Sequence, residues 1–291
     1  MRKCDLSSAC FGEAIEGLVA GDDLGFVLPH EHLTIDTTDM NVVAGPYPPD
    51  AEITIEKLGQ LRRWPRSLAG NALLDDDAAV VRDLRQYASV GGRTLVDLTP
   101  IGMGRDFARY HDIAKQSGVQ IIGATGYYLF YGHRGRVAGR TVSTSLLPVN
   151  PVLDFLAEHA TRVDNIVLCH MDYSLRDLTV HRRALSMGVN VELDLFGYPA
   201  WTRGYVFDMP SDTERVRTLI GLAEEGYARQ IFVSHDVCMK MQMTTYGGYG
   251  YAHLLDAVGE TFEQLTGSRE LLMQFGVENT RRVLCWDDTS S

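Results

Sequence analysis

Apolar runs of strand length alternate with stretches of helical periodicity along most of this chain. We predict strands in the apolar runs at 25–30, 92–100, 118–125, 140–147, 164–172, 188–197 and 229–236. We predict helices where apolar residues recur at helical spacing, over 75–92, 104–119, 150–164 and 211–228. Asn150 and Ser211 are suitable N-caps, and Gly118 and Gly226 are suitable helix stops. This alternation predicts an α/β fold with a parallel sheet, either a barrel or an open doubly wound sheet.

Polar side chains follow the predicted strands and favour the barrel. Histidines and carboxylates stand at the C-terminal ends of the strands, namely His30, His32, Asp97, His170, Asp172, Asp194 and Asp236. In a (β/α) barrel these ends converge on one mouth, where catalytic groups are placed, whereas an open sheet spreads them along a line. No glycine-rich phosphate loop follows the first strand, so a nucleotide-binding sheet has no support. We therefore predict a TIM (β/α) barrel.

The segment "FVLPHEHLTID" at 26–36 holds two histidines one residue apart. Successive side chains of an extended chain point to opposite faces, so His30 and His32 share one face and can bind one metal ion. Pro29 is expected to end the hydrogen-bonded ladder. The alternative is a pair of surface histidines near a turn, since a short His-x-His pattern is common by chance.

The amino-acid composition limits the classes of protein to which this chain can belong. The chain has 291 residues, 45% of them hydrophobic and 22% charged, which suits a single domain over residues 1–291. No apolar run approaches the ~20 residues of a membrane span, and the N-terminal segment lacks a signal-peptide core. The five cysteines show no paired spacing, so we expect a reduced, cytoplasmic protein. A net charge of −11 argues against a nucleic-acid partner.

Six blocks carry a resemblance to a known family. They are "LPHEHL" (28–33), "VDLTPIGMGRD" (96–106), "GATGYY" (123–128), "IVLCHMD" (166–172), "FVSHD" (232–236) and "VENTRRVL" (277–284). In this order, over residues from about 15 to about 286, the chain resembles the phosphotriesterase-related branch of the amidohydrolase superfamily. The segment "SHDVCMKMQMTTYGGYGYAHL" is similar to the bacterial phosphotriesterase-like proteins of the resiniferatoxin-binding type.

The resemblance implies a (β/α)₈ barrel with zinc or another divalent transition metal at its mouth. It implies that His30, His32, His170 and Asp236 are metal ligands. It also implies hydrolysis of a small-molecule phosphotriester, lactone or other ester by metal-activated water, with Asp236 accepting the proton of that water. By analogy with the family we expect a homodimer.

The chain departs from the family pattern in its middle. Ser145 stands where the family has a strand-5 histidine, and no strand-4 block with a bridging lysine or glutamate is found. At ~30 residues per strand–helix unit, strands 3 and 6 should lie roughly 90 residues apart. Ile121 and Val167 are 46 residues apart, and the intervening "GYYLFYGHRGRVAGR" reads as a loop. We therefore predict a barrel short of one β/α unit.

Loss of the bridging residue changes the expected metal site. Two divalent ions repel each other, and a bridging anion is what holds them together. We expect one zinc per chain, held by His30, His32 and Asp236, with His170 as a fourth ligand or a hydrogen-bond partner. His133 is a candidate replacement ligand or a solvated loop residue.

The remaining candidate residues can also be explained by structural roles. Asp97 and Asp194 are expected to orient a ligand histidine by a hydrogen bond. Because side chains alternate along a strand, Cys169 and Cys238 should point away from the ligands and into the core. For the same reason His235 should point away from Asp236. The aromatic residues of 127–131 and 246–251 either line an apolar pocket or anchor loops. Arg105 either binds a substrate anion or pairs with Asp106, and Ser145 is a candidate partner of a water on the metal.

Two classes of function fit these observations. The first is a metal-dependent hydrolase of ester bonds, with Asp236 as the catalytic proton acceptor. The second is a catalytically impaired barrel that acts as a small-molecule binding or scaffold protein. The retained metal-ligand set favours the first class, and the missing unit favours the second, because a barrel that lacks one strand must close differently.

Overall fold

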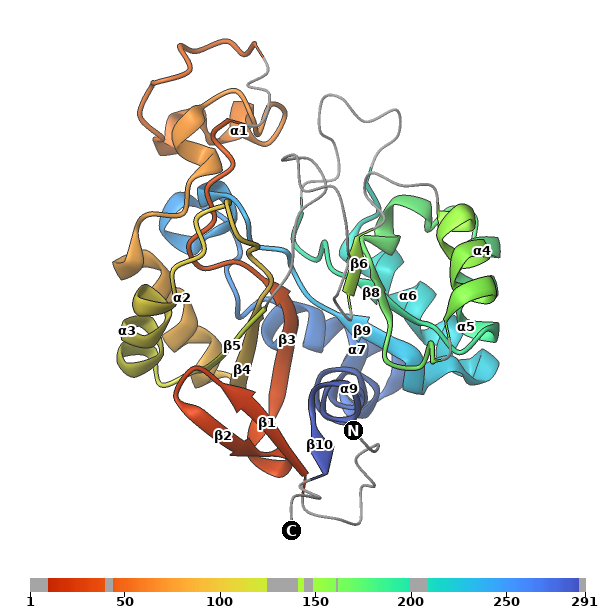
Figure 1. Ribbon diagram of the computed structural model, residues 1–291. Helices are drawn as coiled ribbons and strands as arrows, with labels where there is room; N and C mark the ends of the chain where they lie inside the picture. Colours follow the sequence, from red (N-terminus) through yellow and green to blue (C-terminus); the bar gives the residue numbers. More distant parts are fainter. Residues whose placement is uncertain are drawn as a thin grey trace.

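The computed structural model describes residues 10–39, 44–124, 141–143, 149–160, 162–198 and 209–287. Parallel strands form two sheets within these residues (Figure 1). The first sheet has the order β3 (Phe26–Glu31), β4 (Gly92–Asp97), β5 (Gln120–Gly123). The second has the order β6 (Thr141–Ser143), β7 (Val167–Cys169), β8 (Asn190–Leu193), β9 (Ile231–Val233). Each lies within a predicted strand, except that β3 extends one residue beyond its prediction.

The C-terminal ends of β9 and β3 meet. The backbone N–H of Asp236 donates to His30 O at 3.2 Å, and that of His30 donates to the Ser234 hydroxyl at 3.1 Å. The last strand of the second sheet therefore lies beside the first strand of the first sheet. A single large hydrophobic cluster contains residues of both sheets, including Leu95, Val191 and Val233. This contact positions the candidate site.

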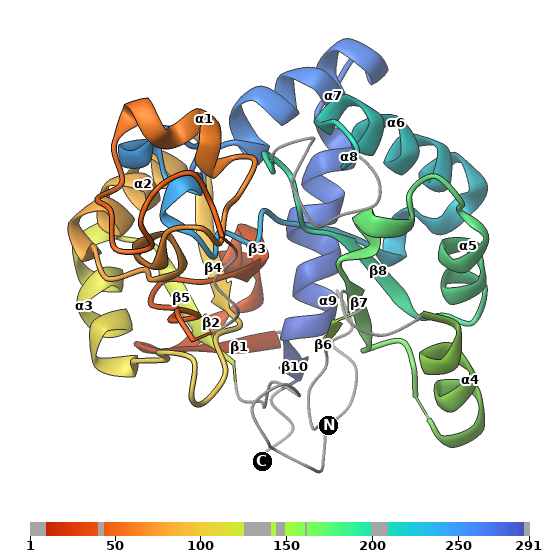
Figure 2. The same cartoon turned by 90° about the horizontal axis from the view of Figure 1, so that it is seen from above.

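Helices cover the outer faces of both sheets. In Figure 1, α2 (Asp77–Ser89) and α3 (Phe107–Ser117) lie outside β3–β5, whereas α4 (Val149–His159), α5 (Thr179–Ser186) and α6 (Asp212–Leu222) lie outside β6–β9. Figure 2 shows the last helices as a column between these two groups, namely α7 (Gly259–Thr266), α8 (Glu270–Met273) and α9 (Thr280–Leu284). None of the described helices is long and apolar enough to cross a membrane.

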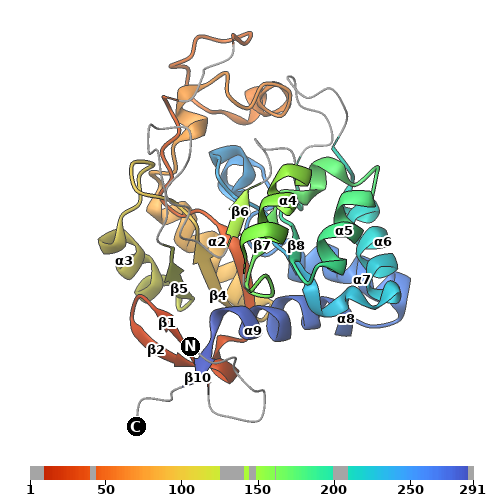
Figure 3. The same ribbon diagram turned by 45° about the vertical axis from the view of Figure 1, so that its right-hand side comes forward.

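Two further parts were not predicted. An antiparallel sheet of β1 (Cys10–Ala14), β2 (Gly17–Ala20) and β10 (Trp286–Asp287) joins the two ends of the described chain. A segment that includes the short helix α1 (Leu58–Leu61) projects at the opposite end of the molecule (Figure 3). These pieces are short and lack a long apolar period, so hydrophobic patterning alone does not reveal them.

Most predicted helix boundaries agree with the structure. Ser211 forms a capping box with Glu214 at the start of α6, and Gly118 ends α3 in the left-handed conformation. The N-cap prediction for Asn150 is wrong, because α4 begins at Val149 and includes Asn150 in its first turn. The following Pro151 lacks an amide hydrogen, which costs little in a first turn, so the helix can begin ahead of it.

The prediction that Pro29 ends the strand is also wrong. β3 continues through Pro29 to Glu31, which pairs with Asp97 of β4. The register shifts between Leu28 and Glu31, as expected where a residue cannot donate to the ladder. The strand therefore carries Glu31 between the two histidines in extended backbone.

The predicted loss of one β/α unit falls between β5 and β6. Residues 125–140 and 144–148 lie outside the described residues, and with them His133, Ser145 and the aromatic residues of 127–131. No strand pairing joins β5 to β6 within the described parts of the chain. The missing unit stays a prediction.

One buried histidine supports the turn that follows β7. His181 of α5 is fully buried, and its Nε2–H donates to the carbonyl oxygen of Met171 at 3.0 Å. Burial lowers the pKa of His181 to about 4. This histidine is therefore neutral in the folded protein at neutral pH and charged in the unfolded chain below pH about 6.5.

We predict that His181 contributes to acid unfolding. Because its folded pKa lies below its unfolded value, its contribution is fully present above pH 6.5 and is lost as the pH falls toward 4. The loss amounts to about 3 kcal/mol of the free energy of unfolding. Chemical denaturation at pH 7, 5.5 and 4 should show a smaller loss for His181→Gln than for the wild-type protein. Parallel pH profiles for the two proteins would contradict this assignment.

Candidate metal site

Three predicted ligands come together where β9 meets β3. The Nε2 atoms of His32 and His30 lie 3.2 and 3.8 Å from Oδ1 of Asp236. One nitrogen of each ring and one carboxylate oxygen lie within 4.8 Å of one another, which suits a shared metal ion. The Nδ1 of His32 lies 2.8 Å from the Thr99 hydroxyl. If Thr99 accepts the Nδ1 proton, the lone pair of Nε2 is available to a metal.

The backbone places two of the predicted ligands by an uncommon conformation. Among the described residues, His170 and Asp236 are the non-glycine residues with positive φ, at 58° and 50°. Left-handed backbone is sparsely populated by L-residues and persists where surrounding contacts impose it. Both residues follow the last residues of a parallel strand, so the turn redirects each side chain at the end of the sheet.

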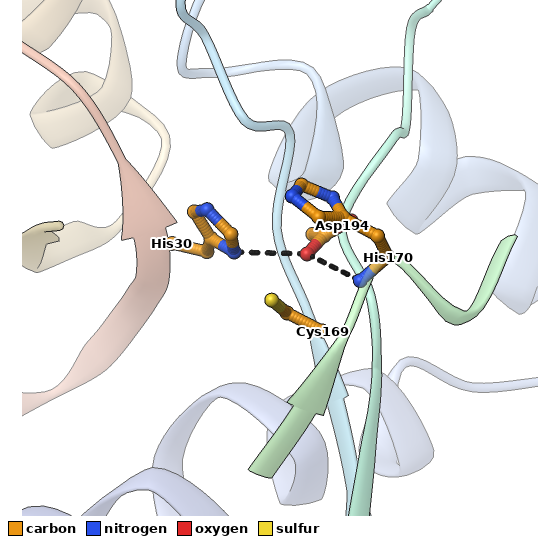
Figure 4. Close-up of side chains that lie close together, drawn as sticks. All are labelled: His30, Cys169, His170 and Asp194. Atoms are coloured by element: carbon orange, nitrogen blue, oxygen red, sulfur yellow. Dashed lines mark hydrogen bonds and ion pairs between the residues drawn. The ribbon is translucent and has the colours of Figure 1, made fainter. Parts of the chain in front are cut away.

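His170 belongs to a second, neighbouring group of donors. Figure 4 shows His30, Cys169, His170 and Asp194 directed toward one another, and one ligand atom of each lies within 4.8 Å of the others. Asp194 Oδ2 lies 2.8 Å from His30 Nδ1 and accepts the backbone N–H of His170 at 2.9 Å. Asp194 Oδ1 lies 2.9 Å from His170 Nδ1. The carboxylate of Asp194 therefore joins two histidines from different sheets.

The prediction that Cys169 alternates away from the ligands is wrong. Cys169 is the last residue of β7, and His170 leaves the strand in the left-handed conformation. Strand alternation therefore ends at Cys169, and both side chains point toward Asp194 (Figure 4). Cys238 is half-buried among apolar residues, as expected for core packing.

The charges of this buried group are strongly coupled. Burial lowers the pKa of both imidazoles, but their electrostatic interactions with Asp194 and Cys169, together with hydrogen bonds, raise it by more. The pKa of His170 is therefore raised to about 10, and that of His30 lies well above its ordinary value. Burial raises the pKa of Asp194, but the two histidines lower it further, so its pKa lies below the ordinary range. Burial raises the pKa of neighbouring Glu192 to about 7.

The buried carboxylate of Glu31 holds the end of β9 in place. Its Oε1 accepts the backbone N–H of His235 and its Oε2 that of Val237, both at 2.8 Å. Oε1 also lies 2.8 Å from Ser234 Oγ and from Nδ1 of His235. His235 thus points away from Asp236, as expected. Glu31 fixes the backbone on both sides of Asp236.

A buried ion pair holds the backbone of Asp194 in place. The fully buried Arg215 of α6 donates from Nε to Oδ1 of Asp172 at 2.5 Å. Asp172 Oδ2 accepts the backbone N–H of Asp194 at 2.9 Å. Asp172 therefore positions the backbone of Asp194, while Asp194 contacts His30 and His170, as expected for a residue that orients ligand histidines.

Asp97 acts on the backbone beside His32 instead of on a histidine ring. It accepts the backbone N–H of Leu33 at 2.7 Å and that of Thr99 at 2.8 Å. The Tyr110 hydroxyl lies 2.8 Å from the same carboxylate. Asp97 therefore holds Thr99, and through it the ring of His32, in position.

The other candidates serve structural contacts. Arg105 donates to Ala124 O at 2.9 Å, whereas Asp106 caps α3, so the predicted Arg105–Asp106 pair does not form. Tyr251 is buried and donates to His32 O at 2.8 Å, which makes it a loop anchor. Tyr249 is 59% exposed and stacks on His253.

The structure thus divides the four predicted ligands between two groups that share His30. Sequence reasoning missed the central place of Asp194 and the participation of Cys169, and also Thr99 and Glu31. The adjacency of Cys169 to His170 in "LCHMD" could have suggested a shared site. That sequence pattern does not predict the left-handed turn that brings both side chains together.

Comparison with known proteins gives a family match. The model of the phosphotriesterase family matches residues 12–155 and 142–284. N-acetyltaurine hydrolase of Salmo salar is 29% identical over 311 residues, which cover 84% of this chain and 88% of that protein. A phosphotriesterase-related protein of Aedes aegypti is 25% identical over 315 residues, covering 81% and 88%. Both alignments are longer than the part of this chain that they include, so these relatives contain residues that it lacks.

Solved structures of other proteins are also similar to this one. The crystal structure of a resiniferatoxin-binding protein from Rhodobacter sphaeroides has 28% identity and a TM-score of 0.85, over 97% of this chain and 96% of that one. A lactonase from Listeria monocytogenes has 20% identity and a TM-score of 0.65, over 94% and 98%. This second likeness concerns the fold alone.

We predict that Glu31→Gln loosens the contact between β9 and β3. The amide keeps one acceptor but sets an NH₂ group against backbone donors, which removes charge-assisted hydrogen bonds. The free energy of unfolding should fall by about 3 kcal/mol in chemical denaturation. Glu260→Gln, an exposed glutamate in α7, should change it by less than about 0.5 kcal/mol. Equal stabilities of the two variants would show that Glu31 does not hold this contact.

Proposed function

Because this chain belongs to the phosphotriesterase family, with its amidohydrolase barrel fold, we propose that it is a zinc-dependent hydrolase of ester bonds. The observation that carries the proposal is the convergence of His30, His32 and Asp236 from the first and last parallel strands. Two imidazole nitrogens and one carboxylate oxygen are donors that suit zinc, and three protein ligands leave a position for water.

The surrounding residues fit this assignment. Thr99 fixes the ring of His32 through Nδ1, so Nε2 faces the group of three donors. The side chains of His30 and His32 are 7% and 9% exposed, against 14% for Asp236. Asp236 is thus the member of the group that solvent reaches most easily.

Each residue then has a defined task. A divalent ion bound here would lower the pKa of a water molecule and polarise the substrate's carbonyl or phosphoryl oxygen. His30 on β3 and His32 just after it would hold the ion through rings kept in fixed orientations. Asp236 accepts the proton of the attacking water, because its carboxylate is a ligand and lies on the more exposed side.

We propose a lactone, aryl ester or phosphotriester as the substrate and one zinc ion at this group. The name of the relative from Salmo salar favours an amide of an aminosulfonate as a second candidate. We also propose that the barrel lacks one β/α unit, which the excess length of the relatives in both alignments supports. By analogy with the family we propose a homodimer. A binding or scaffold protein without turnover is the competing function.

The test is hydrolysis of a panel of lactones, aryl esters, phosphotriesters and N-acetylated aminosulfonates by zinc-loaded protein. Asp236→Asn should lower kcat by about 10²–10⁴-fold on any substrate that is turned over, because the proton acceptor is lost. His32→Ala should bind one zinc per chain fewer than the wild-type protein in elemental analysis.

The matched control is His159→Ala, which removes an exposed histidine of α4 and should leave zinc content and kcat unchanged. Zinc binding that depends on His32, without turnover of any panel member, would support the binding protein instead. Equal zinc content in His32→Ala and the wild-type protein would overturn the metal site.

A further inference from the structure

The second group of donors is a complete ligand set by itself. His30 and His170 offer imidazole nitrogens, Asp194 a carboxylate oxygen and Cys169 a thiol sulfur. In tetrahedral zinc sites the ligand atoms lie about 3.4 Å from one another, given metal–ligand distances of about 2.1 Å. The ligand atoms lie within 4.8 Å of one another, and the Nδ1 atoms of His30 and His170 already lie 2.8 and 2.9 Å from oxygens of Asp194, so on binding some separations shorten while these two lengthen. Side-chain rotations can supply this movement.

Buried acidic side chains surround this point. Asp194 is fully buried, Glu192 and Cys169 are 1% exposed, and all three lie at the ends of adjacent strands. Burial of such groups is unfavourable unless a positive charge compensates them. Within the described chain, the positive charges that face Asp194 are those of His30 and His170 when protonated. A divalent ion compensates the same charges without those protons.

One acidic atom near the group has no partner. Glu192 Oε2 lies 3.5 Å from His30 Nδ1, so the carboxylate is directed at the same ring nitrogen as Asp194. Its other oxygen, Oε1, is buried and has no hydrogen-bond partner among the described residues. Unsatisfied buried polar atoms are rare in native proteins, and a bound ion or water commonly satisfies them. This observation is independent of the four ligand candidates.

The ring of His30 faces both groups of donors. Its Nδ1 lies 2.8 Å from Asp194, and its Nε2 lies 3.8 Å from Asp236. Simultaneous occupancy of both groups would use both nitrogens of this imidazole, so the ring would have to release its N–H proton and bridge the two ions as an imidazolate. The two positions lie on opposite sides of that ring.

We propose that His30, Cys169, His170 and Asp194 form a second zinc site in which the Cys169 thiolate is a ligand. Binding releases the thiol proton of Cys169 and leaves the metal with four protein ligands. A site with four protein ligands lacks an open position for water, so this ion is structural. It links β3 of the first sheet to the ends of β7 and β8 in the second.

All four ligands lie within the described residues, and the site does not require hydrolysis. Its charge is also balanced, because one thiolate and one carboxylate neutralise a divalent ion without a bridging lysine or glutamate. Zinc binding at this site should raise the melting temperature of the protein by linkage.

X-ray absorption of the zinc-loaded wild-type protein is the direct test. A sulfur scatterer should appear at about 2.3 Å beside nitrogen and oxygen at about 2.0–2.1 Å. The cobalt-substituted protein should show the near-ultraviolet thiolate charge-transfer band that nitrogen and oxygen ligands do not give. Both measurements use the intact wild-type chain and do not depend on a variant folding correctly.

Variants then assign the sulfur. Cys169→Ser should lose the sulfur scatterer and the charge-transfer band, should show a smaller rise in melting temperature on adding zinc, and should bind one zinc per chain fewer than the wild-type protein. Cys285→Ser, which changes a buried cysteine after α9, should keep all four. His32→Ala should keep the sulfur scatterer, because His32 belongs to the first group only.

The outcomes separate this inference from the proposed hydrolase. Zinc bound through nitrogen and oxygen alone would overturn the thiolate site and leave the hydrolase proposal intact. Sulfur scattering that persists in Cys169→Ser would also overturn it. Sulfur scattering that disappears in His32→Ala would show that one ion draws on both groups, against a separate site. Absence of zinc from the wild-type protein would overturn both proposals.

Discussion

The carboxylate of Glu31 is the contact on which the geometry of the site depends. It stands between His30 and His32 and points to the opposite face of the strand, where it accepts backbone N–H groups on both sides of Asp236. Its burial makes these bonds strong, and loss of its charge would leave several donors without a partner. A single side chain thereby sets the last strand against the first and places Asp236 opposite the two histidines.

Asp194 has a comparable role for the other half of the site. It contacts His30 from the first sheet and His170 from the second, and its own backbone is held by Asp172 and Arg215. The carboxylate of Asp194 therefore links both sheets. Networks of buried polar groups fix a unique arrangement when all members are satisfied. Among the described residues of this network, Oε1 of Glu192 and Nη2 of Arg215 are buried without a hydrogen-bond partner.

The proposed hydrolase and the proposed structural ion would use two neighbouring groups of donors that share His30. The group with His32 and Asp236 would supply three ligands, as a catalytic zinc site does. The closed group, with Cys169 and Asp194, has four ligands and would hold the two sheets together. With both ions bound, the ring of His30 would lie between them, in place of the bridging lysine or glutamate that was not found in the sequence.

The sequence by itself determined the alternation of strands and helices, the family and the residues His30, His32, His170 and Asp236 as members of one region. These inferences rest on local periodicity and on the order of motifs, and both are present in the linear sequence. The same reasoning failed at Pro29, where the strand continues through a shift of register, and at Cys169, where strand alternation was extended one residue too far.

Only the tertiary structure decided how the candidate ligands divide into two groups. That division depends on the left-handed backbone of His170 and Asp236, which the surrounding hydrogen bonds impose and local propensity opposes. It also depends on contacts between residues far apart in the chain, such as Glu31 with Val237 and His30 with Asp194. Linear patterns encode which side chains are available, whereas these long-range bonds determine which of them meet.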